Sequence, residues 1–200
     1  AMARACAAQS TAMVAVVGAD LRRLGRQLAE VGLTPANYNG AGQLVAAGTS
    51  AAVARLLADP PAGVALRPLT VAGAFHTPFM APATDDFAAA AAEVEFGDAV
   101  HPLISNLDGQ PVTTGAELRM RLVAQITAPV RWDLCLQTLA SFAPRRVIAA
   151  PPGRVLAGIM ARQLPRLSTV SVVTPRDLDG AARLLADDAA TAPTPAGAGV

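Results

Sequence analysis

The stretch Thr11-Ala12-Met13-Val14-Ala15-Val16-Val17-Gly18 is apolar and rich in valine. A short apolar run of β-branched residues that ends at a glycine predicts a buried strand. Working outward from this strand, the sequence predicts further elements before residue 69. These are a helix over 21–31 with Asp20 as its N-cap, extended segments over 36–39 and 43–48, a helix capped by Ser50, and a short strand over 64–66.

Residues 11–68 therefore follow the order strand, helix, strand, strand, helix, strand. This split βαβ arrangement is typical of a ferredoxin-like unit. We predict a small subdomain of that kind over these residues, with a sheet of its own.

The chain after residue 68 alternates strands and helices. A strand over 69–75 leads into His76, and a helix follows over 79–94. Such alternation favours an α/β core with a largely parallel sheet. The later elements are predicted as strands over 102–106, 147–150 and 170–173, and as helices over 116–126, 132–142 and 178–185, with one more helix after Gly153.

The two ends of the chain differ in character. Residues 1–10 have the pattern of the end of a helix, and we expect them to complete the α/β core formed by residues 69–188. Residues 189–200 consist of alanine, proline, threonine and glycine apart from the last valine. A segment with so few apolar side chains to bury is expected to be disordered.

Composition restricts the class of function. The 200 residues are 52% hydrophobic and 16% charged, which is the balance of a globular protein. A net charge of +1 without a basic run argues against a nucleic-acid partner. No apolar stretch is long enough to cross a bilayer, so we expect a soluble cytoplasmic protein without a membrane partner. Cys6 and Cys135 form no closely spaced pair and have no nearby histidine at the spacing of metal ligands, so no metal site is expected.

The segment Gly73-Ala74-Phe75-His76-Thr77-Pro78-Phe79-Met80 carries the clearest candidate for chemistry. His76 follows an aromatic residue at the predicted end of an apolar strand, where a rigid scaffold can present a general base to a cleft. An isolated histidine is more often structural than catalytic, and the residue alone leaves both interpretations open. His101 precedes a proline and is interpreted as structural or exposed.

The segment around His76 resembles the catalytic-histidine segment of the malonyl-CoA:acyl-carrier-protein transacylases and of the related acyltransferase domains of polyketide synthases. Further segments resemble the same family, in the same order and at matching spacing, and together they cover nearly all of residues 1–188. They are Ala1–Ala5, Asn37–Val45, Ile104–Gly109 and Gln125–Trp132.

This resemblance implies an α/β-hydrolase-like core with an inserted ferredoxin-like subdomain, in agreement with the pattern over 11–68. In the family, a serine takes malonyl from coenzyme A as an ester and passes it to the phosphopantetheine thiol of acyl-carrier protein, with a histidine as base. The resemblance thus implies malonyl-CoA as a substrate, acyl-carrier protein as a partner, no cofactor, and a place in fatty-acid or polyketide synthesis.

The resemblance also implies roles for individual residues. His76 is implied as the general base, and the main-chain carbonyl near Gln125 as the acceptor that fixes its ring tautomer in place of a triad aspartate. Phe75 resembles the phenylalanine of malonyl-selective members, where a large ring excludes an extra methyl group; core packing is an equally weighted alternative. Asn37 and Asn39 are candidates to contact substrate or carrier, although asparagine beside glycine is equally a turn former.

The sequence departs from the family at the nucleophile. These enzymes hold their serine in a Gly-x-Ser-x-Gly turn, and no such pentapeptide occurs in the 200 residues; Gly48-Thr49-Ser50-Ala51-Ala52 lacks the second glycine. The Gly-Gln-Gly segment of the oxyanion hole and the arginine that would pair with the malonyl carboxylate have no counterpart either. At 149–153, Ala-Ala-Pro-Pro-Gly stands where the family usually has Glu-x-Gly-Pro-Gly.

Three hypotheses follow for the function. In the first, the chain represents the C-terminal two-thirds of a malonyl transacylase, and these residues alone are inactive. In the second, it is a non-catalytic module that binds acyl-carrier protein or coenzyme A. In the third, it completes a split acyltransferase by giving His76 to a partner chain that supplies the missing N-terminal segment.

Overall fold

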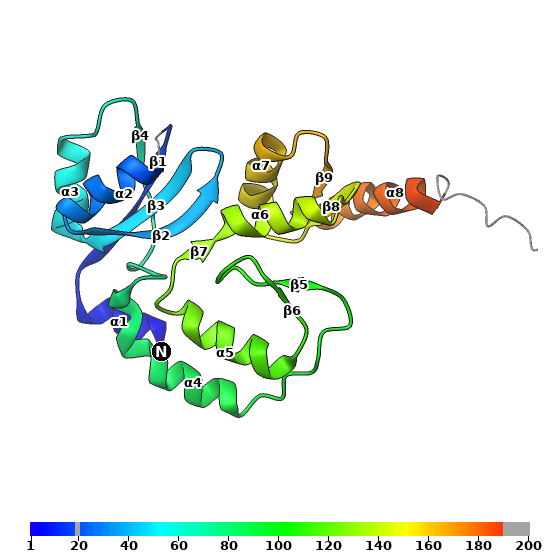
Figure 1. Cartoon of the computed structure of the whole chain (residues 1–200), viewed down its shortest axis with the longest axis horizontal. Coiled ribbons are helices and arrows are strands. Elements are labelled where there is room, and N and C mark those ends of the chain that lie inside the picture. Colours follow the sequence, from blue (N-terminus) through cyan, green and yellow to red (C-terminus); the bar gives the residue numbers. More distant parts are fainter. Residues whose placement is uncertain (19–20, 190–200) are drawn as a thin grey trace, which may run out of the picture. The chain divides into compact units, whose positions relative to one another are not determined.

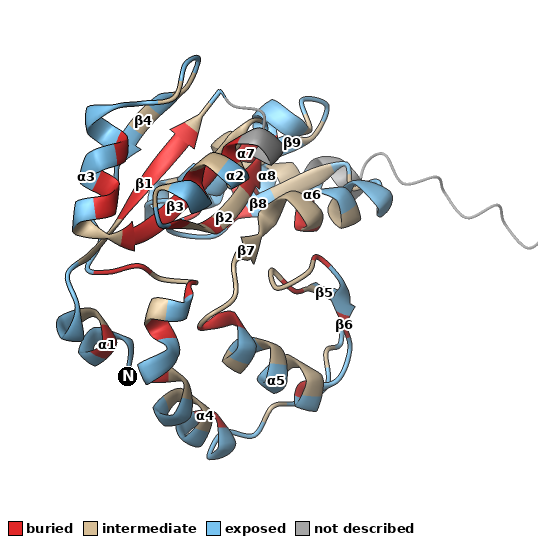
Figure 2. Cartoon of the chain, turned by 60° about the vertical axis from the view of Figure 1, so that its left-hand side comes forward, coloured by how far each residue is buried: buried red, intermediate tan, exposed pale blue. Residues whose placement is uncertain are grey.

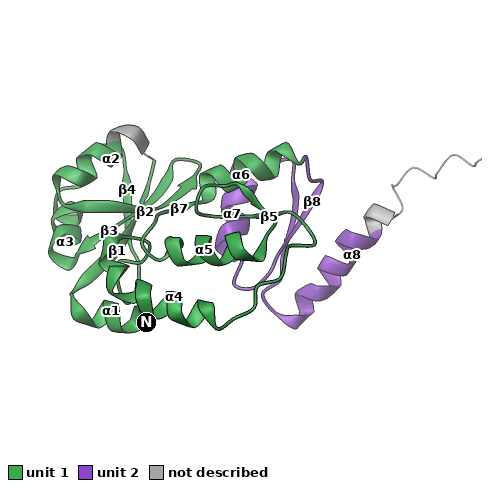
Figure 3. Cartoon of the chain, turned by 60° about the horizontal axis from the view of Figure 1, so that its bottom comes forward, with its two compact units in different colours: residues 1–142 green, residues 143–200 purple. Residues whose placement is uncertain are grey.

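The computed structural model describes residues 1–18 and 21–189 (Figure 1). They form two compact units, residues 1–142 and the residues from 143 onward (Figure 3), and each unit is described by itself. The predicted N-cap Asp20 and the part of the predicted tail after Ala189 lie outside the described residues.

A five-stranded sheet organises the first unit. Its strands are β1 (Thr11–Val17), β2 (Leu33–Gly40), β3 (Gln43–Thr49), β4 (Ala65–Pro68) and β7 (Val130–Arg131). They lie in the order β4-β1-β3-β2-β7, so the first strand of the chain is an inner strand of the sheet. Neighbouring strands are antiparallel except β2 and β7, which run parallel.

One face of this sheet is covered by two helices, α2 (Leu21–Glu30) and α3 (Ser50–Ala58). Val14 and Val16 of β1 point to this face and are fully buried, in one cluster with Leu28 of α2. Apolar side chains at helical spacing supply the contacts from the helices. Figure 2 shows the resulting burial along β1 and β3.

The opposite face of β1 packs against the segment that contains His76. Met13 and Ala15 point this way, because successive side chains of a strand alternate between its two faces. They form a buried cluster with Ala74, and Phe75 packs against that cluster. Both faces of β1 are therefore buried, which explains its continuous apolar sequence and confirms the strand predicted there.

The strand predicted over 69–75 is wrong. The N–H of Leu69 makes the last bond between main-chain groups of this segment and β1, at 3.0 Å from the carbonyl oxygen of Met13. Beyond it, the N–H groups of Val71 and Phe75 bond to carbonyl oxygens two residues earlier, at 3.1 and 3.0 Å. These local turns replace the ladder bonds of a strand. Of the apolar residues that predicted a strand, Ala74 and Phe75 pack against the sheet, whereas Leu69 and Val71 are exposed.

The predicted N-cap of α3 is also wrong by one residue. The side chain of Thr49 accepts a hydrogen bond from the N–H of Ala52 at 3.2 Å, and Ser50 is already helical. The Ser50 hydroxyl instead lies 2.9 Å from that of Ser10. Serine and threonine are similarly suited to the cap position, so the sequence could not decide between these neighbours.

The remaining elements of the first unit include the continuation of the His76 segment. They are α1 (Met2–Ala8), the 3₁₀ helix η1 (Pro78–Ala83), α4 (Thr84–Ala92), β5 (Leu103–Ile104), β6 (Pro111–Val112), α5 (Gly115–Gln125) and α6 (Trp132–Ser141). The helix predicted over 79–94 is therefore present but begins with 3₁₀ geometry. A buried cluster of Ala5, Met80, Ala83 and Ile126 joins α1, η1 and the residue that follows α5.

The second unit contains two parallel strands, β8 (Arg146–Ala149) and β9 (Ser168–Ser171), linked through helix α7 (Arg154–Gln163). This βαβ order confirms the alternation predicted for this part of the chain. A 3₁₀ turn, η2 (Pro175–Asp177), leads into α8 (Leu178–Ala189), which extends beyond the predicted helix over 178–185.

The architecture is mixed α/β, as predicted, but parallel pairing is limited. Strands β5 and β6 lie in the region predicted to form a parallel sheet, yet they pair antiparallel. Their connection is a tight turn, which is too short for the crossover that parallel strands need. Among the described residues, no helix combines the length and apolarity required to cross a membrane.

Candidate active site

His76 lies in a tight turn between β4 and η1 and is half-buried. Its backbone φ is +60°, in the left-handed region that residues other than glycine rarely adopt. Holding a side chain there costs about 1–3 kcal/mol, and such residues persist only where the surrounding structure fixes them. The turn is therefore a constrained feature of the fold rather than a loose connection.

The imidazole of His76 meets the end of α5. Its Nδ1 lies 3.0 Å from the main-chain oxygen of Gln125, the last residue of that helix. The last carbonyls of a helix lack an intrahelical donor, so this oxygen is free to accept. Because a carbonyl oxygen can only accept, the contact places the ring proton on Nδ1 and leaves Nε2 able to take a proton. The structure thus brings together two residues that the sequence analysis singled out.

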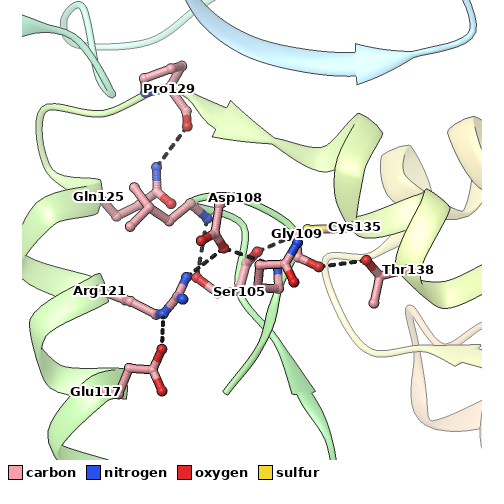
Figure 4. A network of polar contacts seen from close by, with 11 residues as sticks. Ser105, Asp108, Gly109, Glu117, Arg121, Gln125, Pro129, Cys135 and Thr138 are labelled. Carbon is pink, nitrogen blue, oxygen red and sulfur yellow. Dashed lines mark hydrogen bonds and ion pairs between the residues drawn. The ribbon is translucent and has the colours of Figure 1, made fainter.

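The side chain of Gln125 fixes the chain that follows its own carbonyl group. Its Nε2 donates to the carbonyl oxygen of Ala128 at 2.7 Å and to that of Pro129 at 3.2 Å. Figure 4 shows the bond to Pro129. Gln125 is 6% exposed, so these bonds are shielded from water. Its Oε1 is buried and has no hydrogen-bond partner among the described residues. The amide therefore closes the turn after α5 and holds the helix end that faces His76.

One turn earlier in α5, Arg121 links the helix to the β5–β6 turn (Figure 4). Its guanidinium donates to Asp108 at 2.5 Å and to Glu117 at 2.9 Å. Burial alone would raise the pKa of Asp108, but hydrogen bonds from the Gln110 N–H and from Arg121 outweigh it and hold that pKa below its ordinary value. The hydrogen bond to Asp108 is the main cause of the raised pKa of Arg121. This ionic network anchors the helix that carries Gln125.

The other residues that the sequence suggested for the site, Phe75, Asn37 and Asn39, lie on the five-stranded sheet or against it. Phe75 is half-buried and packs in two apolar clusters, one with the sheet and one with η1. Asn37 is half-buried on β2, opposite Val130 of β7, and Asn39 is buried two residues further along. No hydrogen bond joins either asparagine to His76 in the part of the chain that the structure describes.

Sequence reasoning missed the residues that join β2 to the segment after Gln125. The guanidinium of Arg131 lies over the ring of Tyr38, 4.9 Å from its centroid, and makes two bonds to Asp133 at 2.9 and 2.8 Å. The hydrogen bond to Asp133 is the main cause of the raised pKa of Arg131. The spacing of Arg131 and Asp133 was visible in the sequence, but the stacking on Tyr38 comes from distant parts of the chain.

The two cysteines are free thiols in different settings. Cys6 is half-buried, whereas Cys135 is buried and its thiol lies 3.4 Å from the carbonyl oxygen of Ser105. Burial raises the pKa of Cys135 to about 11. Across residues 1–18 and 21–189, no three His, Cys, Asp or Glu side chains gather closely enough to hold a metal ion.

Comparisons with known proteins give consistent matches, although no family model matches the chain. The malonyl CoA-acyl carrier protein transacylase of Mycobacterium tuberculosis is 48% identical over 183 residues, which make up 92% of this chain and 61% of the relative. The crystal structure of MCAT from that organism has a TM-score of 0.85 at 48% identity, over 90% of this chain and 59% of the other. A structure of a type II PKS acyl-carrier protein in complex with its malonyl-transacylase has a TM-score of 0.79 at 31% identity, over 86% of this chain and 58% of the other.

The chain has a mixed α/β fold that matches the solved structures of malonyl transacylases. More specifically, the chain is a homologue of the malonyl CoA-acyl carrier protein transacylases, as the resemblance of its segments predicted. It spans 61% of the length of the Mycobacterium tuberculosis relative.

Proposed function

We propose that this chain provides the general base of a malonyl-transfer site, with His76 as that base. The observation that carries the proposal is the 3.0 Å contact between His76 Nδ1 and the main-chain oxygen of Gln125. This contact supports one ring tautomer and leaves Nε2 for proton transfer. The homology to malonyl transacylases supplies the substrate class, malonyl-CoA, and the acceptor class, the thiol of an acyl-carrier protein.

The proposed chemistry has two steps, transfer of malonyl to a serine and then to the carrier thiol. In the first, Nε2 of His76 takes the proton of a serine hydroxyl as the oxygen attacks the malonyl thioester, and the imidazolium then gives that proton to the departing coenzyme A thiolate. In the second, Nε2 takes the proton of the carrier thiol as its sulfur attacks the malonyl ester, and the serine oxygen recovers the proton. No Gly-x-Ser-x-Gly pentapeptide occurs in these 200 residues, so in this proposal the reacting serine lies outside them.

We also infer the finer architecture that the family implies, an α/β-hydrolase-like core with a ferredoxin-like subdomain over 11–68. The strand order β4-β1-β3-β2, with α2 and α3 on one face, supports the subdomain. In this proposal the subdomain provides the platform against which the His76 segment packs.

Phe75, Asn37 and Asn39 are proposed to shape the substrate site. Phe75 lies directly before His76 and is half-buried, so part of its ring can contact an acyl group. A large ring at this place would exclude a methyl-bearing acyl group by overlap, an effect of about 1–3 kcal/mol. Asn37 and Asn39 lie on the strand next to β7, which follows the Gln125 turn.

A chimera tests the proposal, because the chain spans only part of its relatives. In the Mycobacterium tuberculosis relative, the matched 183 residues are replaced by the corresponding residues of this chain. Transfer of malonyl from malonyl-CoA to acyl-carrier protein is then measured for the chimera, for its His76→Ala variant and for its His101→Ala variant. Binding of acyl-carrier protein to the 200-residue chain alone is measured as well.

The proposal predicts that the chimera transfers malonyl and that His76→Ala reduces kcat/KM by about 10²–10⁴-fold. His101 is exposed and serves as the matched histidine control, so His101→Ala should leave the rate unchanged. A folded chimera whose transfer rate is the same with and without His76 would contradict the proposal. If the chimera is inactive but the chain alone binds acyl-carrier protein saturably, the chain is a binding module instead.

A further inference from the structure

The left-handed turn at His76 is closed by a buried hydroxyl group. Thr77 Oγ1 donates a hydrogen bond to the carbonyl oxygen of Ala74 at 2.6 Å. Thr77 is 0% exposed, so water does not compete for this bond. The bond joins the residues on either side of Phe75 and His76, and it restricts the backbone angles between them.

This hydroxyl serves the turn and not the helix that follows. Thr77 is the N-cap residue of η1, where a threonine side chain ordinarily accepts a bond from an N–H in the first helical turn. Its side chain makes no such capping bond. The first bond of η1 is made by the main-chain oxygen of Thr77, which accepts from the N–H of Met80 at 2.9 Å.

A second threonine anchors the same turn to the sheet. The N–H of Ala74 donates to Oγ1 of Thr11, the first residue of β1, at 3.0 Å. Both main-chain polar groups of Ala74 are therefore held by threonine hydroxyls. Space is tight beside this anchor, since a Cβ added to Gly73 would lie 2.5 Å from Sγ of Cys6 and 3.3 Å from Oγ1 of Thr11.

We propose that Thr77, anchored through Ala74 by Thr11, is a positioning residue for His76. Its hydroxyl holds the positive φ of His76, and this backbone conformation carries the ring to the Gln125 carbonyl. Without the hydroxyl, the Ala74 carbonyl loses its donor, the turn relaxes toward ordinary angles, and Nδ1 leaves its acceptor. The consequence for catalysis rests on the proposed function, whereas the consequence for the ring does not.

Nuclear magnetic resonance of the 200-residue chain labelled with ¹⁵N-histidine tests the proposal. The chain has two histidines, and the exposed His101 provides an internal reference. The readouts are the ring tautomer of His76 and the exchange rate of its Nδ1 proton. The variants are Thr77→Val, which removes the hydroxyl and keeps the shape, and Thr77→Ser, which keeps the hydroxyl. Thr138→Val is the matched control, because Thr138 Oγ1 also donates to a main-chain oxygen, that of Gly109 at 2.7 Å.

Thr77→Val should reduce the Nδ1-protonated tautomer of His76 and speed exchange of that proton by about two- to tenfold, the effect of one net hydrogen bond. Thr77→Ser and Thr138→Val should retain the parent values. Unchanged His76 signals in a folded Thr77→Val chain would overturn the proposal, and so would their loss in Thr77→Ser. If Thr77→Val does not fold, Thr11→Val removes the other anchor and should shift His76 in the same direction; no shift there would also overturn it.

These readouts separate the positioning role from the proposed function. If the tautomer shifts in Thr77→Val but His76→Ala leaves transfer by the chimera unchanged, the positioning role stands and the proposed function fails. If transfer requires His76 but the tautomer of His76 is unchanged in Thr77→Val, the proposed function stands and the positioning role fails.

Discussion

His76 Nδ1 lies 3.0 Å from the main-chain oxygen of Gln125, although the two residues are 49 positions apart in the sequence. Every residue type has a main-chain carbonyl, so this contact alone does not explain why a glutamine stands there. The explanation lies in its side chain, which donates to two carbonyl oxygens of the following turn. One residue thus supplies the acceptor for the histidine and fixes the position of that acceptor.

Replacing Gln125 should therefore destabilise the fold even though the carbonyl remains. Gln125→Met keeps the length of the side chain but removes the donors to Ala128 and Pro129, and we expect a loss of about 1–3 kcal/mol in the free energy of unfolding. Urea unfolding measures the loss. Gln110→Met is the matched control at an exposed position and should change stability by less than about 0.5 kcal/mol. Equal losses in the two variants would show that the amide does not hold the turn.

Because of the ion pair between Asp108 and Arg121, the free energy of unfolding should depend on pH in the acidic range. A pKa lowered by folding contributes stability that is present above the ordinary carboxyl value of 3.8 and is lost as the pH falls through the folded value. Asp108→Asn should therefore cost stability at pH 7, by less than about 1 kcal/mol because the ion pair is partly solvated. The difference from the parent chain should shrink below pH 3.8. Urea unfolding at both pH values measures it, and a difference independent of pH would contradict the role of this carboxylate.

The two thiols should differ in reactivity and in their effect at alkaline pH. Cys135 is buried with a pKa of about 11, so alkylation at pH 8 should modify the half-buried Cys6 first and reach Cys135 only on unfolding. Peptide mass spectrometry after iodoacetamide treatment measures this order. A raised thiol pKa also contributes stability that is present below pH 9.0 and is lost as the pH rises toward about 11. Cys135→Ala should remove that alkaline dependence, and rapid labelling of Cys135 in the native chain would refute this account.

Gly109 should tolerate alanine less well than Gly63, although both glycines have a positive φ. Its φ is +74°, and an added Cβ would lie 2.5 Å from Cβ of Leu134. Gly63 has a φ of +80°, but no atom lies within 4 Å of an added Cβ. Gly63→Ala should cost about 1–2 kcal/mol for the left-handed backbone alone. Gly109→Ala should cost about 1–3 kcal/mol more, because α6 must move away. Thermal and urea unfolding of both variants compare these losses, and equal values would rule out the steric contribution.

The first strand and the first helix after it were predictable because they have clear sequence patterns. The valine-rich run from Thr11 and the leucine spacing of α2 depend on local periodicity, and both elements form where they were predicted. The strand over 69–75 failed for a physical reason. Only Ala74 and Phe75 pack in buried clusters, while Leu69 and Val71 are exposed, and the main chain makes local turns and reaches a positive φ at His76. Apolar composition cannot distinguish these two uses of a short segment.

The candidate site was predictable only in part. His76 and Gln125 were paired through a family resemblance, because no local pattern reveals a contact between a side chain and a distant carbonyl group. The spacing of Glu117 and Arg121 is visible in the sequence as an i, i+4 pair, but the contact with Asp108 depends on how the β5–β6 turn packs on α5. Thr77 gave no signal, since a threonine before a proline is an ordinary helix start.

The proposed role of His76 as the base of a malonyl-transfer site can be measured in the first half-reaction alone. The chimera and its His76→Ala variant are mixed with malonyl-CoA, and intact-protein mass is followed over time. We expect the chimera to gain one malonyl group and His76→Ala to slow this gain by about 10²–10⁴-fold, while His101→Ala does not slow it. Malonyl loading at the same rate in the chimera and in its His76→Ala variant would show that His76 is not the base.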